Sequence, residues 1–144
     1  MDFETLRDRI AKFDQGVDQT VIDLCRSHQQ LIVSLNVDDQ LYQGQNADGS
    51  QVSPAYTPFT IRQKKRFGDP YDRVTLRDTG DFHRSFSVVF SPNEFTLVAS
   101  DPKAVGLERK YGSRIYGLTD ASIDILIGTI FPELQNKFKT QLGS

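Results

Sequence analysis

The segment from Val74 to Phe90, V-T-L-R-D-T-G-D-F-H-R-S-F-S-V-V-F, constrains the fold most, because its hydrophobic period changes in the middle. Asp78-Thr79-Gly80 is typical of a turn, since short polar side chains bond nearby backbone and glycine accepts unusual φ angles. Phe82 and Phe86 then follow at helical spacing, and from Phe86 onward the pattern alternates as in a strand. The segment therefore predicts a turn, a short helical step and a strand. We expect Gly80 to have a positive φ angle or very close neighbours.

Composition indicates one globular domain over residues 1–144, with 38% hydrophobic and 25% charged residues. A net charge of -2 provides no basic field that would recruit nucleic acid or an anionic membrane. The first residues lack the apolar core of a signal peptide, and no apolar run approaches the ~18 residues of a membrane span. We therefore expect protein partners and no membrane contact.

The single cysteine, Cys25, excludes an internal disulfide and a Cys-based zinc cluster. Its apolar, helical surroundings predict a buried and inert thiol. The only other candidate soft ligands are two histidines, His28 and His83, and His28 lies on an apolar helical stripe. The sequence therefore predicts no metal site.

The N-terminal third has helical periodicity on both sides of a break at Gly16. The second stripe has the three-and-four spacing of a coiled-coil seam for under three heptads, which predicts a helix packed on the core. A contact between subunits is the alternative. The first stripe is Phe3, Leu6, Ile10 and Phe13, and the second is Val17, Val21, Leu24, His28, Leu31 and Leu35.

Residues 40–72 are rich in Gln, Asn, Gly, Ser, Pro and Tyr, which predicts an extended loop region and a candidate interaction surface. Within it we expect a tight turn at 47–50, closing a small hairpin between Leu41-Tyr42 and Val52. Asn46-Ala47-Asp48-Gly49 has a superficial likeness to a calcium loop. The positions that should supply the first acidic ligand and the bidentate Glu hold Gly44 and Ala55, so no calcium site is predicted.

Thr57-Pro58 is a helix start, and the helix should run to about Phe67 and end at Gly68. This short helix carries four cations, Arg62, Lys64, Lys65 and Arg66. They are interpreted as a solvated face, as contacts to an acidic patch on a protein partner, or as contacts to DNA phosphates.

The C-terminal half predicts a hairpin, two helices and one further strand. The hairpin pairs Phe86–Phe90 with Phe95–Ser100, and Val74–Leu76 is a candidate third strand. A short helix should start at Pro102 and run through Tyr111, with Gly112 ending it. The last helix starts at Thr119, and Pro132 should kink it or divide it into two abutting helices.

These elements predict an α+β fold. Its parts are N-terminal helices, a long loop with a short basic helix, a small antiparallel sheet within Val74–Ser100, and a C-terminal helix packed on the sheet.

Catalytic motifs are missing from the sequence. Asp81, His83 and Ser85 cannot form a relay at i, i+2, i+4, because His83 would face away from both partners on a helix. The chain has no P-loop, no G-x-G-x-x-G and no H-E-x-x-H. We therefore predict a protein that is no enzyme, with no catalytic residue, no cofactor and no small-molecule substrate. A hydrolase is a distant alternative that a polar pocket around His83 would favour.

The run from Leu76 to Phe86, L-x-D-T-G-x-F-x-x-S-F, resembles the L-x-x-T-G-x-L-x-x-S-I signature of the virion-morphogenesis, or tail-completion, proteins of tailed phages and prophages. Upstream, Tyr56-Thr57-Pro58-Phe59-Thr60 with Lys64-Lys65 is similar to that family's aromatic, Thr and Lys segment. Downstream, Lys110-Tyr111-Gly112 and the run from Arg114 to Thr119, R-I-Y-G-L-T, resemble its H-x-F-G and R-x-F-L-G-L-S elements. The resemblance spans roughly residues 56–134. The family's His has no counterpart here, and Arg109 is the nearest residue.

The resemblance implies a structural virion component that completes the tail or joins it to the head. Its partners would be other neck or tail proteins, with a homo-oligomeric ring in the particle and assembly in the bacterial host cytoplasm. The alternative is a small module that contacts DNA through Arg62–Arg66. The candidate interaction and structural residues are Arg62, Lys64, Lys65, Arg66, Thr79, Gly80, Phe82, Tyr111, Gly112, Arg114 and Gly117.

Overall fold

The computed structural model describes residues 18–92 and 94–142, with side chains to residue 137. The predicted stripe from Phe3 to Phe13, and Val17, lie outside the described residues. The elements in chain order are α2 (Asp18–Ser27), α3 (Gln29–Val37), the 3-10 turn η1 (Leu41–Gln43), α4 (Pro58–Phe67), α5 (Asp81–Arg84), β1 (Phe86–Phe90), β2 (Phe95–Ala99), α6 (Ala104–Tyr111), the 3-10 turn η2 (Ser113–Ile115) and α7 (Asp120–Leu142).

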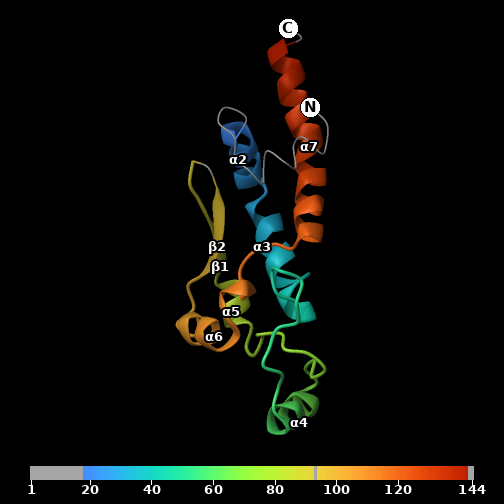
Figure 1. Cartoon of the computed structure of the whole chain (residues 1–144), viewed down its shortest axis with the longest axis vertical. Coiled ribbons are helices and arrows are strands. Elements are labelled where there is room, and N and C mark those ends of the chain that lie inside the picture. Colours follow the sequence, from blue (N-terminus) through green and yellow to red (C-terminus); the bar gives the residue numbers. More distant parts are fainter. Residues whose placement is uncertain (1–17, 93, 143–144) are drawn as a thin grey trace.

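The α+β class is confirmed, and the elements form an elongated molecule (Figure 1). The antiparallel hairpin β1–β2 pairs Phe86 with Ala99 and Phe90 with Phe95. α3 packs on β1, while α7 packs chiefly on α2 and α3. The C-terminal helix was predicted to pack on the sheet, and in the structure α3 lies between them (Figure 1). α4 lies at the end of the long axis opposite α2.

The core is densest where α2, α3 and α7 meet. Their apolar stripes are buried together, as the three-and-four spacing predicted. The fully buried side chains there are Ile32, Leu35, Leu126, Ile127, Ile130 and Leu134. Cys25 is also buried, with 1% of its surface exposed, which confirms the predicted environment of the thiol. The Val21, Leu24 and Leu35 stripe thus forms core.

One helix boundary differs from prediction, and one of the two alternatives for the last helix is excluded. One helix was expected from Val17 to Leu35, but His28 leaves helical geometry with φ -113° and ψ 27° and separates α2 from α3. Its Nε2 lies 2.9 Å from Glu133 Oε1 on α7, so the break faces a polar partner. α7, by contrast, is a single helix through Pro132, not two abutting helices.

By length and composition alone, residues 113–137 form a helical stretch that could cross a membrane, with a mean hydropathy of 1.2. The sequence was expected to contain no such stretch. Core helices of globular proteins also pass this test, and Leu126, Ile127 and Ile130 of α7 are buried, although only 28% of the apolar window is. This finding is therefore weak support for a membrane span.

The predicted third strand is absent among residues 18–92 and 94–142, where the sheet has two strands. Leu76 has φ +56°, a left-handed conformation that a strand cannot contain. Its neighbour Thr75 bonds to side chains in place of a strand: its N–H donates to Tyr56 Oη at 3.0 Å, and its carbonyl accepts from His83. Val74–Leu76 is therefore a buried extended segment held by side chains.

Residues 40–52 are more firmly held than the predicted extended loop. Leu41 and Val52 are buried with the main core, and Leu41 lies in η1, not in a hairpin strand. One bridge between Gln45 and Gln51 takes the place of the predicted hairpin. The tight turn itself is present, with Ser50 N–H donating to Asp48 Oδ1 at 3.0 Å.

Other predicted boundaries are confirmed. Thr57 caps α4 by accepting from Thr60 N–H at 3.2 Å, and α4 ends at Gly68. α6 ends at Gly112. Thr119 Oγ1 accepts from Ser122 N–H at 3.1 Å at the start of α7. Two threonine caps and two glycines therefore set four helix starts or ends at positions that could be read from the sequence.

Candidate functional site

A groove of about 490 Å³ lies between α4 and α6. Each helix contributes one face, because the lining residues repeat at helical spacing. The α4 wall consists of Phe59, Thr60, Gln63, Lys64 and Phe67, and the α6 wall consists of Lys103, Leu107 and Tyr111. This volume lies within the ~300–1,000 Å³ of typical ligand sites.

The floor of the groove is the turn segment that the sequence singled out, with Leu76, Thr79, Gly80 and Phe82. Gly80 has φ +91°, which confirms the predicted positive φ. A Cβ at Gly80 would also lie 2.7 Å from Arg84 Nη1. The floor is thus a sharp turn whose geometry requires glycine.

A network of buried hydrogen bonds holds the strained residue of this floor. Thr75, next to Leu76, is 1% exposed, and His83 Nε2 lies 2.8 Å from its carbonyl oxygen. A carbonyl oxygen only accepts, so Nε2 carries the hydrogen. Burial lowers the pKa of His83 below its ordinary value, which keeps the ring neutral. Tyr56 and His83 thus hold both backbone groups of Thr75, which fixes the chain next to the left-handed Leu76.

The structure brings five predicted residues together in the groove. They are Lys64, Thr79, Gly80, Phe82 and Tyr111. Phe82 and Tyr111 are mostly buried, so their rings form the wall and floor. The residue types that sequence reasoning missed here are apolar ones on α4, Phe59 and Phe67. The spacing Phe59, Gln63, Phe67 was readable, but it was outweighed by the charges between these positions.

The other predicted residues lie outside the groove. Arg62, Lys65 and Arg66 are exposed on α4 and line no part of it. Gly112 ends α6 and begins η2. Arg114 and Gly117 belong to a separate structural junction.

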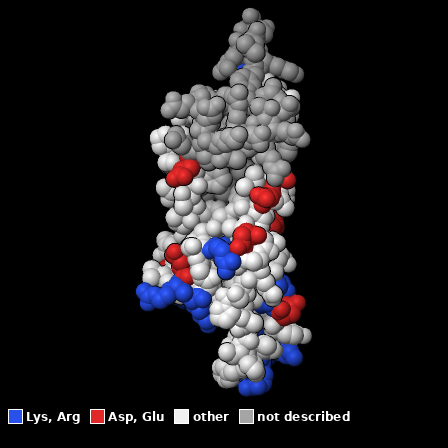
Figure 2. Space-filling view, in the orientation of Figure 1, with Lys and Arg blue, Asp and Glu red and all other residues white. Residues whose placement is uncertain are grey.

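Charge is distributed unevenly along the molecule. Residues 56–84 and 103–114 hold eleven of the seventeen Lys and Arg residues but only five of the nineteen Asp and Glu residues. Figure 2 shows the Lys and Arg side chains of this face gathered toward the lower end, where α4 and α6 lie. Although the whole chain is slightly acidic, the groove therefore lies in a cationic region.

Among the described side chains, the cations of α4 form no ion pair. The two lysines contact aromatic rings instead: Lys64 Nζ is 5.4 Å from the Tyr56 ring centre and Lys65 Nζ is 4.8 Å from that of Tyr71. Lys64 also donates to the Arg77 carbonyl at 2.8 Å. Their charges thus remain uncompensated within this part of the chain.

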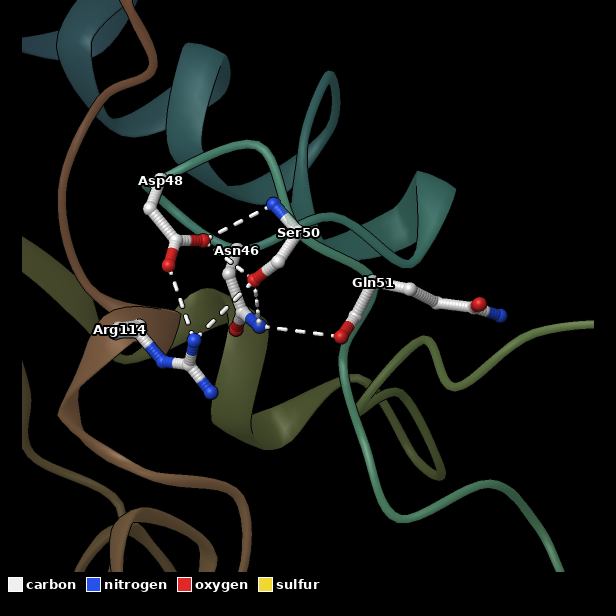
Figure 3. A network of polar contacts seen from close by, with 5 residues as sticks. All are labelled: Asn46, Asp48, Ser50, Gln51 and Arg114. Carbon is white, nitrogen blue, oxygen red and sulfur yellow. Dashed lines mark hydrogen bonds and ion pairs between the residues drawn. The ribbon is translucent and has the colours of Figure 1, made fainter.

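Arg114 holds the turn of the 40–52 loop (Figure 3). Its Nη1 lies 3.0 Å from Asp48 Oδ2, and Ala47 N–H donates to the Arg114 carbonyl at 2.7 Å. Hydrogen bonds from Ser50, and then the charge of Arg114, lower the pKa of Asp48 to about 2. Both charged side chains are about half exposed, so their role is to position the loop.

Gly117 is held by two buried amide side chains that sequence reasoning missed. Asn36 Nδ2 donates to the Ile115 carbonyl, and Asn36 Oδ1 accepts from Gly117 N–H, both at 3.0 Å. Gln40 Nε2 donates to the Gly117 carbonyl at 2.8 Å, and its Oε1 accepts from Thr119 N–H at 2.9 Å. Asn36 and Gln40 are 0% and 1% exposed. Asn36 in α3 and Gln40 just after it thus bind the backbone of the segment before α7 through both a donor and an acceptor each.

A second hollow, of about 560 Å³, lies beside His83 and is bordered by Asp38, Arg77 and Arg84. This is the polar pocket that would favour a hydrolase. Here His83 Nε2 is engaged by Thr75, and Ser85 Oγ donates to the Phe82 carbonyl at 2.7 Å. Each member of the rejected relay has its own local partner, and none of these bonds joins Ser85 to His83.

The described residues contain no group of three or more His, Cys, Asp or Glu that could hold a metal ion. Burial raises the pKa of the Cys25 thiol to about 12, so this cysteine stays protonated at neutral pH.

Comparison with known proteins gives no match: no family model matches the chain, and neither the curated proteins nor the solved structures contain a significantly similar one. The site is therefore interpreted from its own geometry and from the resemblance of its motifs.

Proposed function

We propose that this protein is a non-enzymatic structural component of a tailed phage or prophage particle, acting in tail completion or head–tail joining through protein–protein contacts. The observation that carries the proposal is the position of the family-like motifs. The T-G turn, the upstream Lys64 segment and the downstream Tyr111 segment are far apart in the sequence, yet they line one groove. A shared surface is what motifs of a common assembly role require.

The proposed partners are other neck or tail proteins of the virion, and the proposed assembled form is a homo-oligomeric ring. A ring needs one patch of each copy to meet a different patch of the next copy. The cations of α4 and the exposed carboxylates of Asp38, Asp39 and Asp120 are complementary patches of this kind. The Val21–Leu35 stripe is used mainly inside the protein, so it supplies no seam for a two-fold contact.

Light scattering of the purified chain tests the ring. We expect mostly monomer at micromolar concentration, with ring formation only on a neighbouring virion protein that supplies a high local concentration. Any residual association should weaken as salt is raised, because charged contacts are screened. A tight, salt-insensitive dimer would contradict this arrangement.

Deletion of the gene from the phage or prophage that carries it tests the function itself. We expect separate heads and tails in electron micrographs of induced lysates, and joined particles again when the intact chain is supplied in trans. The Gly106→Ala variant supplied in trans is the control and should also restore joined particles, because a Cβ at Gly106 meets no atom within 4 Å. Normal, infectious particles from the deletion strain would overturn the proposal.

DNA contact through α4 is a second candidate, favoured by the four cations that lack ion pairs. Such contact would produce a strong decrease of affinity with salt. The neighbouring groove of exposed phenylalanines weighs against duplex DNA, because the phosphate backbone on the outside of a duplex offers nothing apolar to cover them.

A further inference from the structure

We propose that the α4–α6 groove binds an acidic amphipathic segment of a neighbouring virion protein, with apolar side chains in the groove and carboxylates on its rim. This inference rests on the proposed assembly role, for which it specifies the chemistry of the partner. The partner segment lies in the groove, whereas the α4 cations outside the groove, Arg62, Lys65 and Arg66, remain available for the contact between copies in the ring.

The apolar part of the partner follows from exposed aromatic surface. Phe59 and Phe67 of α4 are 62% and 70% exposed, and no residue of α4 is buried. They line the groove together with Leu107 and with the buried rings of Phe82 and Tyr111. Large aromatic side chains on a concave surface are the usual anchors of protein contacts. A partner that inserted apolar side chains here would cover both phenylalanines.

The acidic part follows from the rim. Lys64, Lys103 and Arg77 line the groove, against the two carboxylates Asp69 and Asp78. Among the described residues, none of these three cations forms an ion pair. Arg62, Lys65 and Arg66 extend the positive region along α4. Carboxylates on the incoming segment would meet this field, which favours binding and correct orientation.

The shape of the groove favours a helix or a short extended segment. Each of its two walls is a series at i, i+4, i+8: Phe59, Gln63 and Phe67 on α4, and the α6 cap Lys103 with Leu107 and Tyr111 on α6. A groove between two helices accepts an amphipathic helix through its apolar face. The Gly80 turn and the fixed Leu76 hold the floor in its conformation before a partner binds, so little conformational entropy is lost there on binding.

Selection of short random peptides displayed on phage tests this chemistry. The intact chain is the bait, and the double variant Phe67→Ala/Lys103→Glu is used for counter-selection. We expect enriched peptides to combine Asp or Glu with Phe, Leu or Ile at helical spacing. Failure to enrich any peptide, or enrichment of peptides without carboxylates or without apolar residues, would overturn the proposal.

Fluorescence anisotropy with the best enriched peptide then locates the site. We expect Phe67→Ala and Lys103→Glu each to weaken binding by about tenfold or more. Val105→Ala and Arg109→Glu are the matched controls, since both residues are exposed on α6 and neither lines the groove. Equal weakening by the controls would place the peptide elsewhere and contradict the groove.

A labelled DNA duplex in the same assay separates the two macromolecular partners. We expect weak DNA binding that Phe67→Ala leaves unchanged and that does not compete with the peptide. DNA that displaces the peptide, and is lost in Lys64→Glu and Lys65→Glu but not in Phe67→Ala, would replace the peptide proposal with the DNA one. Peptide binding without a particle defect in the gene deletion would retain the groove and reject the virion role.

Discussion

The two ends of this molecule differ in how their apolar residues are used. At one end α2, α3 and α7 bury most of their aliphatic stripes, with Ile32, Ile127 and Ile130 all 0% exposed. At the other end α4 buries no residue and exposes Phe59 and Phe67. Helix α4 is defined by its Thr57 cap and its Gly68 end, without burial of a face. One end is therefore stabilised by its own apolar contacts, whereas the other leaves large apolar side chains exposed.

Truncation of one buried and one exposed apolar side chain should give the greatest difference in stability between the two ends. Ile127→Ala should destabilise the protein by about 2–5 kcal/mol, because it leaves a cavity in a closed core. Phe67→Ala should change stability by no more than about 0.5 kcal/mol, because the ring is largely in solvent already. Urea unfolding of both variants gives the two values. Similar losses for both would show that α4 is part of the stabilising core.

The next effect concerns the turn between the two ends. Gly80→Val should destabilise by on the order of 1–3 kcal/mol, because a β-branched residue is strained at φ +91°. Gly106→Val is the matched control: its site is open, and the expected change is within about 0.5 kcal/mol. Denaturation midpoints of the two variants decide. An unchanged midpoint for Gly80→Val would contradict a required left-handed glycine.

A smaller effect should appear as a pH dependence. The folded-state pKa of His83 is lowered from its ordinary value of 6.5, chiefly by burial. At a pH below 6.5 the unfolded chain therefore binds a proton at this residue more readily than the folded protein does. Stability from this residue is therefore complete above pH 6.5 and is lost as the pH falls below that value. Thermal unfolding of the intact protein and of His83→Gln, followed between neutral and mildly acidic pH, isolates the contribution. The variant should lose less stability over this window, and parallel curves would exclude His83.

The smallest free energy should be that of local opening at α4. Few buried contacts hold this helix, so it should open without unfolding of the core. Limited trypsin digestion should cut first at Arg62–Arg66, while Arg26 of α2 resists. The peptide of the proposed groove should slow this cleavage. Earlier cutting at Arg26 would reverse the stability order of the two ends.

Much of this contrast was readable in the sequence, because it depends on local signals. The stripe with Val21 and Leu24, the Thr57 and Thr119 caps, the β1–β2 hairpin and the Gly80 turn follow from spacing and from side-chain chemistry within a few residues. The groove could be predicted from the sequence only in part. Lys64 and Phe82 were singled out separately, but nothing local indicates that α4 and α6 face each other.

The errors came from bonds between residues distant in sequence. Thr75 fits a strand by pattern, but Tyr56 and His83 take its backbone groups, and a pattern cannot show such partners. Asn36 follows the last apolar position of the predicted helical stripe, and Gln40 opens the predicted loop region, so both looked like ordinary polar positions. Their burial depends on a segment about eighty residues away, which periodicity does not report.

The amide contacts of Asn36 and Gln40 with residues 115–119 also have a consequence for the order of folding. Each of these bonds spans 77 to 81 residues of chain, so a long loop must close before any of them forms. The β1–β2 hairpin and α4 need only neighbours and can form while the chain is still incomplete. During synthesis the amide side chains of Asn36 and Gln40 therefore stay hydrated until residues 115–119 have left the ribosome. The polar junction is then among the last contacts to be made, and its closure joins the N-terminal helices to the start of α7.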